Sequence, residues 1–167
     1  HANGFSLVRK IIDVTGTRLD DHIDGLDFPL GEALLEPTRI YHHGIRAAHA
    51  AGHVTGICHV TGGGLVENPP RVFGEDLSLV IDCTSWTLPS IFSWLSRKGG
   101  IEAGEMARTF NCGIGLVIFT SEDSAGSCLS ALRDGPEPDA WIVGRLSARS
   151  DGPRVVFSGQ ESWSTAS

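Results

Sequence analysis

Four short clusters of polar residues in this chain carry more chemistry than a fold alone requires. The most informative is the run Thr61-Gly62-Gly63-Gly64, which follows an apolar segment with strand character at residues 54–60. Consecutive glycines between a strand and a helix let the backbone approach a ligand closely, with N–H groups free to point at an anion. Phosphate is the natural candidate for this loop, and a plain tight turn is the alternative interpretation.

The second cluster is the turn that opens the sequence. Asn3 and Gly4 have turn chemistry and lead into a segment with helical spacing at residues 5–12. Free N–H groups at a helix start attract anions, and Ser6 adds a hydroxyl donor there. His1 could donate a proton or stabilise a developing oxyanion, or it could be an ordinary chain terminus.

The remaining two clusters hold Arg39 and Asn111. The pattern predicts a helix over residues 38–51, so Arg39 falls in its first turn, where the helix dipole disfavours a cation. A cation there indicates an anionic partner, although an ion pair with Glu36 or Glu67 is equally allowed. Asn111 directly precedes an apolar strand, where open α/β sheets often place ligand-binding groups. It could instead bond to the backbone of a tight turn.

Histidine and cysteine do not form a metal-binding pattern in this sequence. Because no carboxylate lies beside the clustered histidines and no C-x-x-C pair occurs, we predict no metal site. The four cysteines are widely spaced, which favours reduced core thiols in a cytoplasmic protein over disulfides. The histidines in question are His42, His43, His49, His53 and His59.

Composition narrows the range of partners. The chain of 167 residues has a net charge of -7 and no basic stripe, so we expect no nucleic-acid partner. No apolar run approaches the length that spans a membrane, so we expect no membrane partner either. This length fits one domain with a core of its own.

The order of elements predicts an α/β or α+β fold in which helices cover a mixed sheet. Residues 113–120 form the most apolar run and are predicted as a central strand. Residues 140–148 and 154–158 are predicted as a hairpin-like pair, and residues 159–167 as a frayed polar tail. Further strands are expected at residues 54–60 and 77–83, and helices at residues 5–12, 30–35, 38–51, 65–72, 88–95, 101–110 and 122–132.

Taken together, the clusters resemble the C-terminal domain of aminoimidazole ribonucleotide synthetase, also called phosphoribosylformylglycinamidine cyclo-ligase. The resemblance covers residues 1–158 in order, and its motifs are H-A-N-G-F-S-L-V-R, L-L-E-P-T-R-I-Y, H-V-T-G-G-G-L-V-E-N-P-P-R-V and M-A-R-T-F-N-C-G-I-G. It implies the fold of that superfamily and an N-terminal ATP-binding domain outside this sequence. The opening turn, with no leader before it, fits a fragment of a longer polypeptide.

The resemblance also implies an activity, namely ATP-dependent ring closure of formylglycinamidine ribonucleotide in purine biosynthesis. ATP and Mg²⁺ would be held mainly by the N-terminal domain, and the full-length protein would be a homodimer. His1 and Asn3 are implied as catalytic residues that face the amide or amidine end of the substrate. The implied ligands of this small-molecule ribonucleotide are Ser6, Arg39, Thr61, Gly62, Gly63, Gly64, Asn68 and Asn111.

Two other interpretations stay open. The chain could belong to a related enzyme, such as formylglycinamidine ribonucleotide synthetase, selenophosphate synthetase or thiamine phosphate kinase. It could also be a non-catalytic phosphate-binding module, because the fragment alone is expected to be inactive. Ala2, where the family usually has serine, removes one possible hydroxyl ligand.

Overall fold

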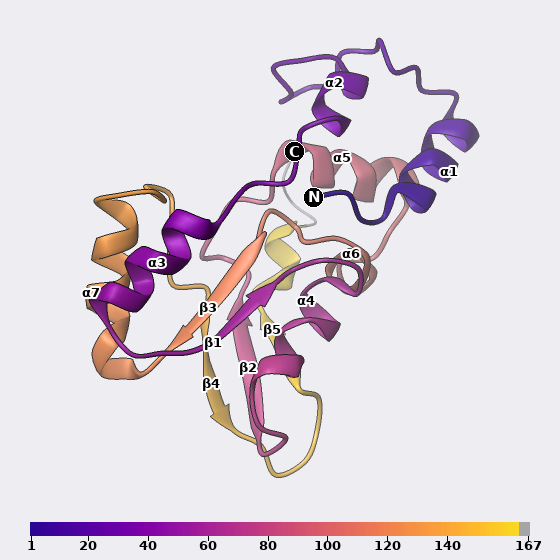
Figure 1. The fold of residues 1–167 in the computed structure, drawn as a ribbon. Helices are drawn as coiled ribbons and strands as arrows, with labels where there is room; N and C mark the ends of the chain where they lie inside the picture. Colours follow the sequence, from indigo (N-terminus) through magenta and orange to yellow (C-terminus); the bar gives the residue numbers. More distant parts are fainter. Residues whose placement is uncertain (164–167) are drawn as a thin grey trace.

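The computed structural model describes residues 1–163, in which helices surround two small β-sheets (Figure 1). The α/β class with mixed strands is therefore confirmed. The strands are β1 (Val54–His59), β2 (Leu77–Asp82), β3 (Leu116–Thr120), β4 (Gly144–Ala148) and β5 (Val155–Ser158). The helices are α1 (Phe5–Thr15), α2 (Leu30–Leu34), α3 (His42–Ala51), α4 (Gly64–Glu67), α5 (Ser90–Gly99), α6 (Ala103–Thr109) and α7 (Glu122–Arg133), with 3-10 turns η1 (Pro69–Val72) and η2 (Gln160–Trp163).

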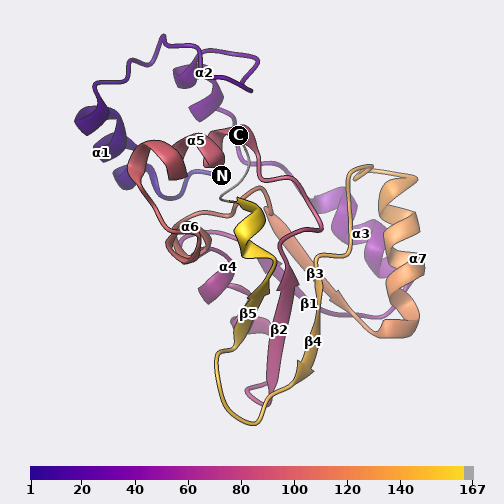
Figure 2. The same cartoon turned by 180° about the vertical axis from the view of Figure 1, so that it is seen from behind.

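Helix α1 follows its sequence pattern closely. It begins after Gly4 and ends before Gly16, two glycines in the left-handed region with φ of 77° and 65°. Its apolar side chains at Val8 and Ile11 are buried, as the helical spacing predicted. The helix packs against α5 at one end of the molecule (Figure 2).

The last two strands do not form the expected hairpin, so that prediction is wrong. Strand β2 lies between them, antiparallel to β4 and parallel to β5. The loop between β4 and β5 crosses the end of β2, where the Arg149 side chain donates hydrogen bonds to the carbonyls of Glu75 and Gly152. Alternating apolar residues suit either arrangement, because the pattern does not encode which strand is the neighbour.

Strand β3 is not the central strand that its apolar composition indicated. Among residues 1–163 it pairs only with β1, antiparallel, with Ile57 opposite Ile118. Val117 and Phe119 are buried in the core on one face of the strand, the alternate residues are partly buried, and the strand also contacts α7. Packing against a helix thus accounts for the apolar run without a central place in a sheet.

Prolines shift several helix boundaries from the predicted ones. Helix α3 begins at His42 rather than at residue 38, and Pro37 and residues 38–41 before it have no regular structure. Helix α5 begins at Ser90, directly after Pro89. The helix expected over residues 65–72 divides into α4 and η1 because Pro69 and Pro70 lack N–H groups.

The core is continuous and reaches further along the chain than expected. The frayed tail is contradicted as far as Trp163, because η2 places its indole in the core at 5% exposure. Residues 164–167 lie outside the described part of the chain.

All four cysteines are buried, and burial raises the pKa of the Cys58 thiol to about 11 and that of Cys83 to about 12. No helix within residues 1–163 has the length and apolar character needed to cross a membrane.

Candidate functional site

The glycine loop between β1 and α4 has a backbone that only glycine adopts easily. Gly63 and Gly64 have φ of 95° and 56°, and the Gly64 N–H donates to the Thr61 carbonyl at 2.9 Å. A side chain on Gly64 would overlap the Ala107 carbonyl oxygen and lie 2.6 Å from that of Phe110. The loop is therefore pressed against α6, and the third glycine is needed for this close approach.

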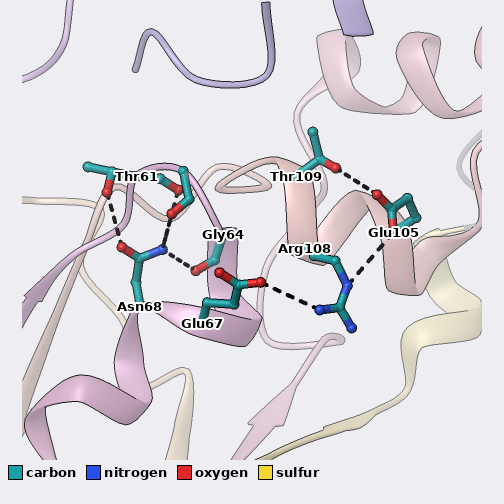
Figure 3. A network of polar contacts seen from close by, with 8 residues as sticks. Thr61, Gly64, Glu67, Asn68, Glu105, Arg108 and Thr109 are labelled. Carbon is teal, nitrogen blue, oxygen red and sulfur yellow. Dashed lines mark hydrogen bonds and ion pairs between the residues drawn. The ribbon is translucent and has the colours of Figure 1, made fainter. Parts of the chain in front are cut away.

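Asn68 holds the loop in shape from below (Figure 3). Its amide nitrogen donates to the carbonyls of Gly62 and Gly64 at 3.0 and 2.9 Å, and its oxygen accepts from the Thr61 hydroxyl at 3.0 Å. The residue is 3% exposed. With its polar atoms committed to the loop, Asn68 acts on any ligand through the shape of the loop. The N–H groups of Gly62 and Gly63 have no hydrogen-bond partner within residues 1–163.

Replacing Asn68 by aspartate is expected to lower the free energy of unfolding by roughly 2–4 kcal/mol, because a buried carboxylate would face carbonyl oxygens and lose the amide donor. Urea denaturation measures this loss. Asn111→Asp is the matched control, since Asn111 uses only its oxygen, which accepts from the Gly113 N–H at 3.1 Å. Equal losses in the two variants would contradict the role given to the Asn68 amide.

An ion-pair chain joins the base of the loop to α6 (Figure 3). Arg108 lies 3.6 Å from Glu67 and 3.8 Å from Glu105, measured between nitrogen and carboxylate oxygen. Each of these side chains is more than half exposed, so the pairs add little stability. Their effect is to orient the end of α4 relative to α6.

The opening turn meets the glycine loop through His1. Its Nδ1 lies 3.0 Å from the Val60 carbonyl oxygen, directly before the loop, and its Nε2 lies 2.8 Å from the Tyr41 hydroxyl. A side chain on Gly4 would run into the Phe110 ring, which precedes Asn111. The segments around residues 1–4, 60–64 and 110–115 therefore converge on one region, as the sequence motifs together required.

Three of the predicted site residues lie in or next to these converging segments, and they differ in burial and in hydrogen bonding. Asn3 is half-buried and Ser6 is exposed in the first turn of α1, and neither side chain makes a hydrogen bond within the described residues. Asn111 satisfies the backbone of its turn, which was the alternative that the sequence left open. That turn includes Cys112 at φ 51° and Gly113 at φ 93°.

Arg39 lies elsewhere. It precedes α3 instead of occupying its first turn, so the argument from the helix dipole does not apply. Its guanidinium pairs with Glu137 at 3.0 Å, a partner other than the two considered from sequence. It lines a cavity of about 600 Å³ between β3, α7 and the segment 139–146, a cavity whose lining includes none of residues 61–64. The same lining includes Tyr41 and Gly115, so the cavity reaches the neighbourhood of His1 but not the glycine loop itself.

Two residues near His1 were missed as site residues. Tyr41 bonds to the imidazole, and Gly115 leaves the space for this contact, since a Cβ there would overlap the Tyr41 hydroxyl and lie 2.6 Å from His1 Nε2. The sequence signal for this contact was the glycine itself, because a glycine within an apolar strand pattern often marks a close approach.

Residues 1–163 contain no group of three or more histidine, cysteine or acidic side chains placed to hold a metal ion.

Comparison with known proteins agrees with this arrangement of motifs. Residues 1–156 match the family described as AIR synthase related protein, C-terminal domain. The chain is 44% identical over 158 residues to the human (Homo sapiens) trifunctional purine biosynthetic protein adenosine-3. That match covers 93% of this chain and 16% of the relative, so the chain corresponds to a small part of that protein. The chain belongs to the family of AIR synthase related C-terminal domains.

Proposed function

We propose that this chain is the C-terminal half of an aminoimidazole ribonucleotide synthetase, which closes the imidazole ring of formylglycinamidine ribonucleotide in purine biosynthesis. The observation that carries the proposal is the convergence of the opening turn, the glycine loop and the turn at residues 110–115. Family membership and the similarity to a purine biosynthetic protein support it.

In the proposed reaction, the formyl amide oxygen of the substrate is phosphorylated by ATP, an amidine nitrogen attacks the same carbon, and phosphate leaves. The difficult step is to turn a poor leaving oxygen into a good one, with the developing charge stabilised by preorganised donors. Such donors on this chain are the N–H groups of Gly62 and Gly63, which have no partner within residues 1–163. We propose that they cradle a phosphate.

Some of the other predicted residues shape the loop in this proposal, and others contact the substrate. Thr61, Gly64 and Asn68 shape the loop, as their hydrogen bonds support. Ser6, whose hydroxyl has no partner among the described residues, is proposed to add a phosphate contact, and Asn111 to hold the adjacent turn. His1 and Asn3 are proposed to face the amide or amidine end. Arg39 is the weakest member of the set because Glu137 already neutralises it.

ATP and Mg²⁺ are proposed to be held mainly by an N-terminal ATP-binding domain that pairs with this one. The side chains of residues 1–163 do not supply a metal-ligand set, so we derive no step through Mg²⁺ on this chain. The complete enzyme is proposed to be a homodimer in the cytoplasm. Family membership as a C-terminal domain supports the pairing of the two domains.

Ring closure with purified protein tests the proposal. The chain joined to an ATP-binding domain of the same family is expected to form aminoimidazole ribonucleotide from ATP and formylglycinamidine ribonucleotide, whereas the 167-residue chain alone is expected to form none. Turnover of selenide or thiamine phosphate in place of that substrate would overturn the assignment. Product from the chain alone would overturn its description as half of a site.

A further inference from the structure

His1, Tyr41 and His59 form a compact aromatic cluster beside the glycine loop. Their ring centroids lie 4.7 to 5.9 Å apart, and all three pairs meet edge to face. Tyr41 and His1 are half-buried, while His59 is exposed. Of the contacts within this cluster, only that between His1 Nε2 and the Tyr41 hydroxyl, at 2.8 Å, is a hydrogen bond.

The hydrogen bonds of His1 define its tautomer. Nδ1 lies 3.0 Å from the Val60 carbonyl oxygen, and a carbonyl can only accept, so the ring proton is on Nδ1. In neutral His1, Nε2 is then an acceptor, and the Tyr41 hydroxyl is the donor that meets it. The imidazole is thereby held at both nitrogens, by main chain on one side and by a phenol on the other.

We infer that Tyr41 is a positioning residue, which holds the ring of His1 in a fixed orientation next to the glycine loop, in the tautomer that the Val60 carbonyl selects. The inference rests on the catalytic role proposed for His1. It adds Tyr41 as the residue that orients the imidazole for that role. A histidine that acts in proton transfer must present one nitrogen in a defined direction. The Val60 carbonyl leaves the lone pair on Nε2, and the hydroxyl of Tyr41 fixes where that lone pair points.

The surroundings of Tyr41 suit a permanent donor. Burial raises the pKa of its hydroxyl, with smaller opposing effects of Arg39 and Glu137, so the phenol keeps its proton at neutral pH. A raised pKa favours the neutral phenol, and only the neutral phenol has a proton to donate to Nε2. Tyr41 is also the single tyrosine of the chain, so removing its hydroxyl removes every phenol.

Gly115 supports the pair from the start of β3. Its carbonyl accepts from the Val60 N–H at 2.9 Å, which fixes the same Val60 whose carbonyl binds His1. A Cβ on Gly115 would overlap the Tyr41 hydroxyl and crowd His1 Nε2. Because both obstructed groups are side-chain ends, Gly115→Ala should displace the pair without preventing folding.

The test is nitrogen NMR on protein labelled with ¹⁵N-histidine, which reports the tautomer without any activity. We expect a protonated Nδ1 and an unprotonated Nε2 in the unmodified chain. Tyr41→Phe, which removes only the hydroxyl, is expected to shift the Nε2 resonance of His1, because that nitrogen loses its donor while Nδ1 keeps its bond to Val60. His59→Phe is the matched control, because it keeps the ring contacts and should leave the His1 resonances in place.

Kinetics of the chain joined to an ATP-binding domain complete the test. Tyr41→Phe and Gly115→Ala are expected to lower kcat about tenfold, the loss of one hydrogen bond, with KM within about twofold. Unchanged His1 resonances in Tyr41→Phe, or an Nε2-protonated ring in the unmodified chain, would overturn the inference whatever the kinetics. Shifted resonances with unchanged kcat would support the positioning and count against the catalytic role of His1.

Discussion

Replacing Gly64 by alanine is expected to lower the free energy of unfolding by about 3 kcal/mol or more. The residue has φ of 56°, which L side chains adopt at a cost. Its Cβ would also overlap the Ala107 carbonyl oxygen and lie 2.6 Å from that of Phe110. Both obstacles are backbone atoms of or next to α6, so relief requires a movement of the helix. Urea denaturation of the two proteins measures the difference.

Gly62→Ala is the control for this loss. A Cβ on Gly62 meets no atom within 4 Å, and its φ is not positive. We therefore expect a change in unfolding free energy within about 1 kcal/mol, as for most exposed substitutions. If the two alanine variants were equally stable, the loop would not be pressed against α6 in the way described.

Replacing His1 by alanine is expected to lower kcat for ring closure by about 100-fold or more, the usual loss for a general acid or base. The imidazole is anchored at Val60, directly before the loop proposed to hold phosphate, and it is proposed to face the amide or amidine end of the substrate. Steady-state kinetics of the chain joined to an ATP-binding domain give the measurement. KM is expected to change much less than kcat.

His53→Ala provides the comparison in the same assay. His53 is exposed directly before β1, and its main chain donates to the Ser124 hydroxyl and accepts from the Ser121 N–H. Its replacement is expected to leave kcat unchanged. Turnover of His1→Ala at the level of the unmodified enzyme would remove His1 from the proposed catalytic residues.

Local patterns in the sequence predicted the local structure well. The apolar spacing of α1 and the glycines that flank it specify both the buried face and the two ends of that helix. The strand–glycine–helix order around residues 61–64 predicted a tight loop, and the loop has this form. Both features depend on residues within a few positions of each other, which is where sequence patterns carry the most information.

Long-range pairings were not predictable in the same way. Nothing in residues 140–158 states that β2 separates β4 from β5, because alternation does not name the neighbouring strand. The pairing of Arg39 with Glu137 likewise joins distant segments. Both features join segments that are far apart in the chain, as the packing of α3 on α7 also does, and a single sequence does not encode such choices locally.

The candidate site shows the same division between local and distant information. The motifs identified His1 and the glycine loop, but only the fold joins them, through the Val60 carbonyl. Tyr41 and Gly115 were missed because they are far apart in the sequence, and only the fold brings them into contact beside His1. Asn68 was identified, yet its polar atoms serve the loop, a distinction that depends on side-chain geometry.

The proposed function depends on phosphate binding by the N–H groups of Gly62 and Gly63, which have no partner within residues 1–163. A titration of the ¹⁵N-labelled chain with inorganic phosphate, followed by amide chemical shifts, tests this most directly. We predict saturable shifts centred on Gly62 and Gly63 that are absent from Gly64→Ala, where the loop is displaced. Shifts confined to the cavity lined by Arg39 and β3, or no saturable shift in the glycine loop, would contradict it.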